Sequence, residues 1–214
     1  MSKSEKSSKY CYPGTDVLIN KLNIQDYVKL QKAERIYSAA RLMELHDNPI
    51  IGNFDLQHLQ RIHKYIFQDI YDFAGKIRTE EISKENSLFA FVSQIENYFY
   101  QYITEPLRLE KYLKGLNRKE FSHRAAHYLG EINAVHPFRE GNGRAQREFI
   151  RTLALINGFE LDFSLVNPEE LLHAFKVSFL NSSEKLGKLI EQSIVNHIPN
   201  RDLILKYNSR KLNY

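Results

Sequence analysis

The chain has 214 residues, of which 43% are hydrophobic, and this is enough for one domain with a substantial core. No apolar run is long enough to cross a bilayer, no segment has the pattern of a secretory signal, and the single cysteine, Cys11, suits a reducing compartment, so we expect a cytoplasmic protein without a membrane span. The net charge of only +4, spread along the chain, argues against nucleic-acid binding as the main role.

The predicted elements are mostly helices. Residues 1–9 are rich in Ser and Lys and are expected to be disordered. Apolar side chains recur at steps of three and four residues across 25–46 and again across 54–70, and this spacing predicts two amphipathic helices. The sequence DNPIIGN between them supplies the Pro and Gly that end the first helix.

Residues 76–91 change character, because short extended stretches flank a central SKEN, and they predict a small β-hairpin. A helix is expected over 92–104, interrupted near Pro106, which lacks a backbone N–H. The fold class is therefore all-α with one small hairpin, in a single domain over 10–198. Further helices are expected over 119–134, 144–157, 167–180 and 184–197, followed by a loose polar tail over 199–214.

The sequence HPFREGNGRAQR, residues 136–147, lies between two predicted helices. The first turn of the second helix has unpaired N–H groups and the positive end of the helix dipole. Gly141 and Gly143 allow the backbone to approach a ligand closely, and Asn142 adds a polar side chain and tolerates the left-handed conformation. We therefore expect a cradle for an anion at this position.

Charged and aromatic side chains surround this cradle. Arg144 and Arg147 are three residues apart, so they share a helix face and can reach one phosphate together. Glu140 suits a Mg²⁺ ion that phosphate oxygens and waters also bind, and His136 suits the role of a base near pH 7. Phe138 is predicted to point into the core. The set predicts transfer of a phosphate-containing group from a nucleotide, although a simple connecting loop would account for each residue taken alone.

The stretch matches the signature of the Fic (filamentation induced by cAMP) family, H-x-F-x-[DE]-G-N-G-R-x-x-R, at every specified position. The segments YCYPGTDVLINKLNI (10–24), YDFAGKIR (71–78) and ISKENSLFAF (82–91) are also similar to this family, so the resemblance covers about residues 10–190. It implies a Fic-type helical bundle with a β-hairpin flap over the active site.

The resemblance implies a protein adenylyltransferase, which moves AMP from ATP to a Ser, Thr or Tyr hydroxyl of a target protein. It implies that His136 is the base, that Glu140 holds Mg²⁺, and that the flap over 76–91 aligns the target by main-chain pairing. It also implies that the loop forms an anion hole over the α- and β-phosphates, with Gly141, Asn142 and Gly143. Arg144 and Arg147 would hold the polyphosphate, with Arg147 at the γ-phosphate. Ser83 and Lys84, at the flap turn, would contact the nucleotide.

There are two alternatives to AMP transfer, of which only the second belongs to another class of function. A Fic fold can transfer another group, such as phosphate or UMP. Relatives with Ala-Asn-Lys at 141–143 resemble kinases, so the intact Gly-Asn-Gly favours AMP. The other alternative is a catalytically silent adaptor that only binds proteins. Such a relative is expected to lose His136, which is present here.

Regulation leaves a sequence signature in this family. Many Fic enzymes carry an inhibitory helix with the pattern [ST]-x-x-x-E-[GN], whose Glu pairs with the second arginine of the motif. Glu85, Glu96 and Glu140 are followed by Asn or Gly, but none has Ser or Thr four positions earlier. The resemblance therefore implies a toxin restrained by a separate small antitoxin, with Arg147 as its ion-pair target. A degenerate inhibitory segment and the lack of any inhibitor are the alternatives.

Three other polar residues have no assigned role. His58 and His63 are expected to be ordinary exposed or half-buried side chains. Arg151 extends the arginine face of 144–147 by one turn, and a surface ion pair is expected there rather than a contact near the nucleotide.

Overall fold

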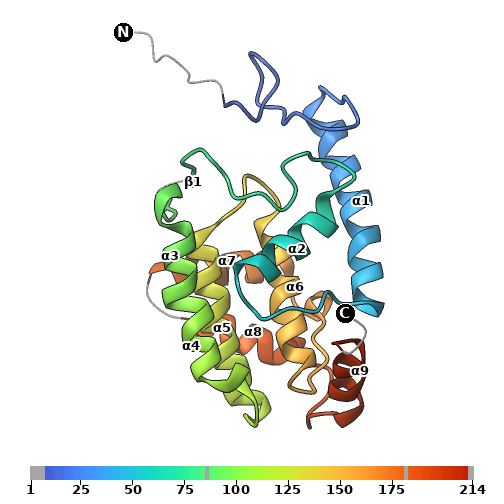
Figure 1. Ribbon diagram of the computed structural model, residues 1–214, viewed down its shortest axis with the longest axis vertical. Coiled ribbons are helices and arrows are strands. Elements are labelled where there is room, and N and C mark those ends of the chain that lie inside the picture. Colours follow the sequence, from blue (N-terminus) through green and yellow to red (C-terminus); the bar gives the residue numbers. More distant parts are fainter. Residues whose placement is uncertain (1–7, 85–86, 181–182, 212–214) are drawn as a thin grey trace.

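The computed structural model describes residues 8–84, 87–180 and 183–211. Within these ranges the chain is built from α-helices and one antiparallel hairpin, in which Ser83 pairs with Leu88 and Lys84 with Ser87 (Figure 1). The all-α fold with a small hairpin is therefore confirmed. The elements are α1 (Tyr27–Asp47), α2 (Leu56–Phe67), β1 (Ser83–Lys84), β2 (Ser87–Leu88), α3 (Ile95–Phe99), α4 (Glu105–Leu109), α5 (Arg118–Val135), α6 (Asn142–Leu155), α7 (Pro168–Leu180), α8 (Glu184–Ser193) and α9 (Arg201–Lys211).

Short polar side chains set the starts of the main helices. Asp26 accepts a hydrogen bond from the third residue of α1, and Asp55 does the same for α2. Asn117 and Glu120 form a reciprocal capping box at the start of α5. Asn167 accepts the N–H of Glu169 at 2.8 Å as α7 begins. Each cap satisfies an N–H group that the helix itself cannot, which is worth about 1 kcal/mol.

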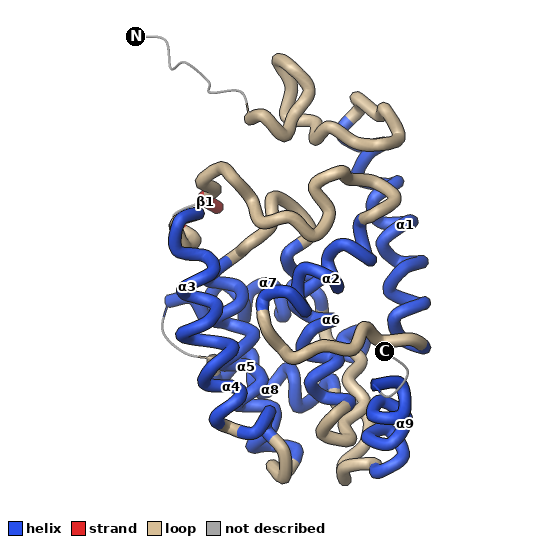
Figure 2. Tube along the Cα trace, viewed as in Figure 1, coloured by secondary structure: helices blue, strands red, loops and turns tan. Residues whose placement is uncertain are grey.

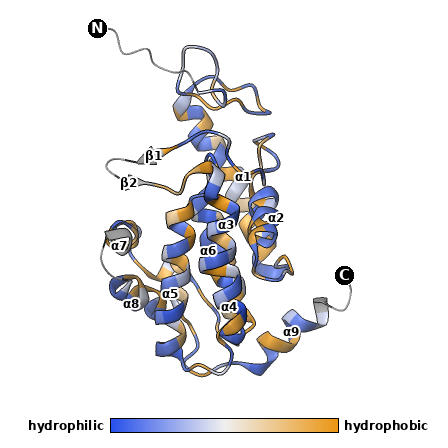
Figure 3. Cartoon of the chain, turned by 60° about the vertical axis from the view of Figure 1, so that its left-hand side comes forward, coloured by the Kyte–Doolittle hydropathy of each residue, from blue (hydrophilic) through white to orange (hydrophobic). Residues whose placement is uncertain are grey.

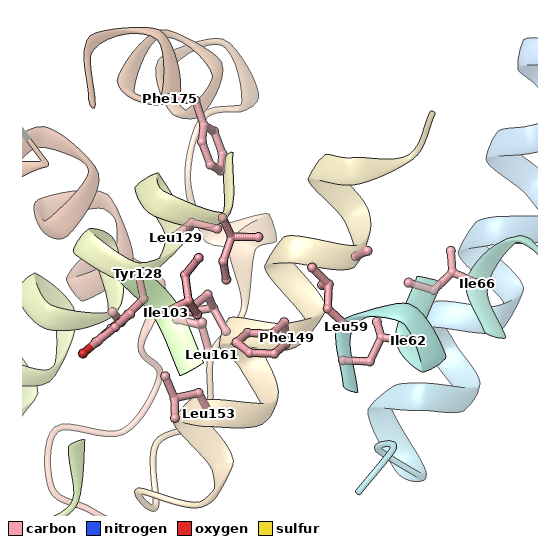
Figure 4. Packing of buried hydrophobic residues seen from close by; sticks show 14 of the residues in the cluster. Leu59, Ile62, Ile66, Ile103, Tyr128, Leu129, Phe149, Leu153, Leu161 and Phe175 are labelled. Carbon is pink, nitrogen blue, oxygen red and sulfur yellow. The ribbon is translucent and has the colours of Figure 1, made fainter. Parts of the chain in front are cut away.

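The core lies around α5 and α6. Helix α6 packs against α2 and α5, while α5 also packs against α7 and α8, and α1 covers α2. Figure 4 shows Leu59 and Ile62 of α2 facing Phe149 of α6, and all three side chains are fully buried. Burying each side chain contributes about 2 kcal/mol. Figure 3 shows hydrophobic and hydrophilic residues alternating along the helices. Helix α2 buries the apolar stripe that the sequence predicted, whereas the amphipathic face predicted for 25–46 is wrong, because α1 buries only Leu30, Ser38 and Leu45 and exposes Val28 and Ile36.

The segment between the hairpin and α5 differs from the expected break at Pro106. This proline lies in the first turn of α4, where a helix tolerates a residue without a backbone N–H. The irregularity comes one turn earlier, in a π-helical turn over Tyr100–Thr104, where the N–H of Glu105 bonds to the carbonyl of Tyr100. The helical path therefore continues past the proline with a local widening.

The loose tail predicted from residue 199 is wrong for residues 201–211, which form α9. Tyr207 is only 4% exposed, and α9 packs against α6. The side chain of Asn200 accepts the N–H of Asp202 at 2.8 Å as this helix begins. This mostly polar segment is ordered because the side chain of Tyr207 is buried in the core. The composition of the segment does not reveal this contact.

The N-terminal segment lies over the root of the hairpin. Residues 1–9 were expected to be disordered. Residues 1–7 fall outside the described residues, and the expectation is wrong for Ser8 and Lys9, which both donate hydrogen bonds to the carboxylate of Glu80. The side chain of Ser8 donates to Glu80 at 2.7 Å, and Tyr10 contacts Thr79 by a 2.9 Å hydrogen bond and the ring of Phe73 edge-on. These contacts join the start of the described chain to the segment that leads into β1.

The connection from α5 to α6 lies at the same end of the bundle as the hairpin. In Figure 2 the N-terminal loops and the loop that carries β1 lie at this end, above the helices, while other loops lie lower, near α9. The N–H of Arg78 donates to the carbonyl of Pro137 at 2.8 Å, and the N–H of Ala90 donates to that of Ala134 at 3.0 Å. The fold thus brings the flap segment and the 136–147 motif together. No helix of the described residues is long and apolar enough to cross a membrane.

Candidate active site

His136 follows the last residue of α5 and adopts the left-handed conformation, with φ 46° and ψ 60°. A non-glycine residue rarely adopts this conformation, and it turns the chain sharply out of the helix. The ring Nδ1 lies 3.3 Å from the carbonyl oxygen of Asn133, and the imidazole stacks on the ring of Phe89 with the centroids 3.9 Å apart. With the Nδ1 proton directed at that carbonyl, Nε2 is the nitrogen that can accept a proton.

The side chain of Asn142 closes the loop. Its amide Nδ2 donates to the carbonyl of Phe138 at 2.8 Å, and its Oδ1 accepts the N–H of Phe138 at 2.9 Å. Phe138 is fully buried, as the sequence predicted. The left-handed residue, however, is Gly141 at φ 78°, while Asn142 is the first residue of α6. The side chain of Asn142 therefore shapes the loop from inside, and only its backbone can serve an anion.

The lack of a side chain matters at Gly141 and at Gly143 for different reasons. A Cβ on Gly141 would lie 2.3 Å from the ring of Phe67, so the loop can pass this ring only without a side chain. A Cβ on Gly143 would lie 3.3 Å from the Nη1 atom of Arg147. The absence of that atom keeps the first turn of α6 open beside the guanidinium.

The amino end of α6 lies where the sequence predicts an anion cradle. The helix begins at Asn142, two residues earlier than expected, and the N–H groups of Arg144 and Ala145 already bond to the carbonyl of Gly141. Within the described part of the chain, the N–H groups of Asn142 and Gly143 donate to no protein acceptor. Two unsatisfied donors at the positive end of a 14-residue helix attract a negative ligand.

His63 of α2 holds the loop from below. Its Nδ1 accepts the N–H of Gly75 at 2.9 Å, so its Nε2 carries the proton and donates to the carbonyl of Glu140 at 2.8 Å. Its ring stacks on Phe138, with the centroids 3.8 Å apart. Burial lowers the pKa of His63 to about 4, so the ring is neutral at neutral pH and keeps this hydrogen-bond pattern.

The sequence interpretation of His58 and His63 as ordinary exposed or half-buried residues is wrong, because both are fully buried. His58 bonds to the carbonyl of Ile50 at 2.9 Å, and burial lowers its pKa to about 4 as well. A signal for His63 was present in the sequence. It lies four residues after Leu59 and three before Ile66, on the stripe that α2 buries.

Arg144 is bound within the protein. Its guanidinium pairs with the carboxylate of Glu34 in α1 and donates to the hydroxyl of Ser38 at 2.9 Å. It also lies over the ring of Phe67, 4.7 Å from the centroid. The hydroxyl of Tyr71 donates to the other oxygen of Glu34. A role for Arg144 in holding phosphate stays a prediction, and it requires the guanidinium to share its charge with Glu34.

Arg147 is in the opposite situation. Its side chain is half-buried, and among the described residues it has neither an ion pair nor a hydrogen bond. Burial, and after it the charge of Arg144, lowers the pKa of Arg147. Since a guanidinium stays charged at any ordinary pH, the result is a partly desolvated cation that an anion would stabilise.

Glu140 is exposed beside the cradle, and one of its carboxylate oxygens accepts the N–H of Gly141 at 2.9 Å. No group of three His, Cys, Asp or Glu side chains in the described ranges is arranged to hold a metal alone. A Mg²⁺ ion at Glu140 would therefore take its other ligands from phosphate oxygens and water, as this ion commonly does. An exposed carboxylate next to an anion cradle fits that arrangement.

Three further expectations concern residues around the site. The backbone of Ser83 and Lys84 lies in β1, but their side chains are outside the described residues, so their contact with a nucleotide stays a prediction. Arg151 forms an ion pair, at 2.7 Å from Glu148, but it is buried and not on the surface. It also donates to the carbonyl of Leu45 at 2.7 Å, which directs it toward the end of α1.

Residues 53–154 match the sequence profile of the Fic/DOC family. Protein adenylyltransferase VbhT of Bartonella schoenbuchensis is 42% identical over 207 residues, which cover 96% of this chain and 43% of VbhT. The Escherichia coli protein named "Probable protein adenylyltransferase Fic" is 37% identical over 160 residues, which cover 75% of this chain and 78% of that protein. The chain belongs to the Fic/DOC family, and it spans less than half the length of VbhT.

Solved structures give the same assignment. BepC of Bartonella tribocorum, solved with bound AMPPNP, superposes with a TM-score of 0.79 at 28% identity, over 86% of this chain and 95% of that one. The N-terminal Fic domain of a VirB-translocated Bep effector protein of Bartonella quintana, solved with bound ADP, gives 0.82 at 29% identity, over 92% and 97% of the two chains. The fold predicted from the 136–147 motif is confirmed.

Proposed function

We propose that this protein is a protein adenylyltransferase that moves AMP from ATP to a hydroxyl group of a target protein. One observation carries the proposal. Arg147, a partly desolvated cation without a carboxylate partner among the described residues, lies one turn from the two unsatisfied N–H groups that begin α6. His136 begins the loop that leads to this helix. A polyphosphate satisfies the cation and the donors together, and the names and bound nucleotides of the relatives agree with this ligand.

The proposed chemistry is an in-line displacement at the α-phosphorus. The target oxygen attacks this phosphorus while Nε2 of His136 accepts the hydroxyl proton. The bond from the α-phosphorus to the bridging oxygen breaks, and pyrophosphate leaves with the electron pair. The N–H groups of Asn142 and Gly143 donate to the phosphate oxygens as charge develops, and Arg147 binds the terminal phosphate. A Mg²⁺ ion at Glu140 would neutralise further phosphate charge.

The hairpin is proposed as the docking element for the target. Its strands pair over two residues each, and such a short hairpin leaves backbone donors and acceptors for an added strand. The target therefore presents its hydroxyl in an extended segment that pairs with the flap over 76–91. Ser83 and Lys84, in β1, are proposed to contact the nucleotide from the same element.

Inhibition is proposed to come from a separate small antitoxin protein in the cytoplasm. The chain lacks the pattern [ST]-x-x-x-E-[GN], and Arg147 is left available to an external carboxylate. A glutamate on that residue would displace the terminal phosphate from its site. A synthetic helical peptide carrying this pattern should inhibit the wild-type enzyme, and its Glu→Ala version should not. Equal inhibition by both peptides would contradict the proposal.

The test of the activity uses purified protein, Mg²⁺, a cytosolic extract as the source of targets, and ATP labelled at the α-phosphate. Label should appear on protein with the wild type and be absent with His136→Ala. ATP labelled at the γ-phosphate and labelled UTP separate transfer of phosphate or UMP from transfer of AMP. Equal labelling by the wild type and His136→Ala, or label from the γ-phosphate alone, would overturn the assignment.

A further inference from the structure

Arg78 is a fully buried charge at the junction of the flap and the motif loop, and its side chain has no exposed area. Its Nε donates to the carbonyl of His136 at 2.9 Å, and its Nη2 donates to the carbonyl of Ala90. Its Nη1 donates to the carbonyl of Glu80 at 3.0 Å and lies 3.2 Å from the carboxylate of Glu81. One guanidinium therefore joins both sides of the flap root, residues 78–81 and 89–92, to His136.

The energetics of this arrangement favour a specific role. Burying a guanidinium is costly unless its donors are all satisfied, and here most of its acceptors are backbone carbonyls. These carbonyls lie on three separate segments, so the planar group fixes their positions relative to one another. A lysine has one nitrogen and cannot bond to all of them at once. A buried charge of this kind contributes little more to stability than well-packed apolar side chains would, so stability alone does not explain it.

The bonded segments reach the imidazole directly. The N–H of Ala90 donates to the carbonyl of Ala134 in α5 at 3.0 Å, and the carbonyl of Ala90 accepts from Arg78. Both backbone polar groups of Ala90 are therefore bonded. The residue before it, Phe89, stacks on the ring of His136. The N–H of Arg78 also donates to the carbonyl of Pro137. The ring of His136 is thus set by its own backbone, by the carbonyl of Asn133 and by Phe89. Arg78 bonds to the backbone of His136 and to Ala90, the residue next to Phe89.

We propose that Arg78 is a positioning residue for the proposed transfer reaction: it clamps the two sides of the flap root onto the carbonyl of His136, and thereby orients the imidazole against Phe89. This inference rests on the proposed function. It also couples the binding of the target to the orientation of His136. A target strand that pairs with the flap contacts the same element whose root, residues 78–81 and 89–92, Arg78 bonds to His136. Docking of the target and readiness of the base are then linked through one side chain.

The test compares Arg78→Lys and Arg78→Gln with the matched variants Arg151→Lys and Arg151→Gln. Arg151 is also a buried arginine that bonds to a backbone carbonyl and a glutamate, but among the described residues none of its hydrogen bonds reaches the flap or the loop. The melting temperature, the Kd for ATP with Mg²⁺, and kcat and KM for a modified target are measured for all four. Phe89→Leu is added, because it removes the stacking without removing the buried charge.

The Arg78 variants should lower kcat about 100-fold and leave the Kd for ATP within about twofold, because a displacement near 1 Å has this effect on a catalytic group. Phe89→Leu should lower kcat about tenfold by the same mechanism. The Arg151 variants should lose melting temperature comparably and keep kcat. Arg78 variants that melt earlier but retain the wild-type kcat and KM would show a merely structural role and overturn the proposal.

A readout independent of activity separates this inference from the proposed function. The imidazole signals of His136 are assigned by NMR from their loss in His136→Ala. Contacts between the His136 and Phe89 rings should weaken in Arg78→Lys and persist in Arg151→Lys. If these contacts behave so but the wild type transfers no AMP, the proposed function fails and the positioning role stands. If the contacts persist in folded Arg78→Lys, the positioning role fails whatever the activity.

Discussion

The motif loop, residues 136–141, and the hairpin formed by β1 and β2 lie beside each other but are built in different ways. The loop is bonded on its inner side at each bend. Asn142 bonds both polar groups of Phe138, and His63 bonds the carbonyl of Glu140. The hairpin has strands of two residues each and is joined to the bundle at its root.

The difference matches what each region has to recognise. A phosphate chain has a constant shape, and donors that are fixed in advance do not need to reorganise when charge develops. A target protein brings a variable segment, and a short hairpin with unpaired backbone groups can accept different side chains by main-chain pairing. We therefore expect changes in the loop to alter stability and chemistry together. Changes in β2 of the hairpin, away from Arg78 and Phe89 at the flap root, should alter mainly the binding of the target.

The largest effect is expected from Gly141→Ala. The new Cβ adds the strain of φ 78° and meets the Phe67 ring at 2.3 Å, so the free energy of unfolding should fall by about 3 kcal/mol. Gly115→Ala is the matched control, because its φ is +85° and no atom lies within 4 Å of the added Cβ, and it should cost about 1 kcal/mol. Urea denaturation measures both. Equal losses would mean that Phe67 does not restrict the loop.

Acid should loosen the same loop through His63. Its pKa in the folded protein is about 4, below the value near 6.5 for an unfolded chain. The unfolded state therefore binds the proton first, and the free energy of unfolding should fall as the pH is lowered from about 6.5 toward 4, by up to about 3 kcal/mol. His58, with a pKa of about 4, contributes similarly.

Single variants separate these two contributions. His63→Gln should remove about half of the pH dependence and also lower kcat, because the ring that stacks on Phe138 and bridges Gly75 and Glu140 is lost. His58→Gln should remove a similar share and leave kcat unchanged. Denaturation curves between pH 4 and pH 8 measure the slopes. An unchanged slope in His63→Gln would show that this ring is protonated equally in both states.

The two motif arginines should separate stability from binding. Arg144→Met leaves the carboxylate of Glu34 with Tyr71 as its main partner, so the free energy of unfolding should fall by about 1–3 kcal/mol. Arg147→Met removes a cation without an ion pair among the described residues and should change stability by less than about 0.5 kcal/mol.

For the affinity for ATP, Arg147→Met should have a larger effect than it has on stability. Arg147→Met should weaken the Kd for ATP by about 10- to 100-fold, because charge-assisted hydrogen bonds to phosphate are lost. Calorimetric titration with ATP and Mg²⁺ and urea denaturation of both variants provide the measurements. A loss of stability in Arg147→Met as large as that in Arg144→Met would reveal a partner for Arg147 within the protein.

The smallest effect is expected in the flap root. Glu81 accepts the N–H of Val92 at 3.0 Å and lies against Arg78, but more than half of its side chain is exposed. Glu81→Gln should therefore change the free energy of unfolding by less than about 0.5 kcal/mol. It should raise KM for the target a few-fold, at an unchanged Kd for ATP. Steady-state kinetics with varied target concentration measure this, and a change in the Kd for ATP alone would contradict it.

Local signals in the sequence predicted most of the fold. The apolar stripes and the cap at Asn167 act over three or four residues, so most helices were found close to their observed bounds. Asp26 and Asp55, which cap α1 and α2, were placed inside the predicted helices. The 136–147 motif is equally local, and its spacing predicted the cradle and the buried Phe138. Helix α9 was predicted as a loose tail and missed, because the segment is mostly polar and its order depends on the burial of Tyr207 and on packing against α6.

The supports of the site act over long separations in the chain. Arg78 bonds to His136 across 58 residues, His63 to Glu140 across 77, and Arg144 to Glu34 across 110. The sequence around a single arginine or histidine does not indicate which distant residue it will bond to. Periodicity places His63 on a buried face, but only the packing of α2 on α6 shows which carbonyl it meets.

By itself the sequence determined the helices, the family motif and the residues that can carry charge or a proton, because these depend on the order of neighbours along the chain. The tertiary structure alone decided that Arg144 is paired with Glu34, that Arg147 is not, and that Arg78 joins the flap to His136. The physical reason is desolvation: the partner of a buried charge is chosen by whichever groups the fold brings within hydrogen-bond distance when water is removed.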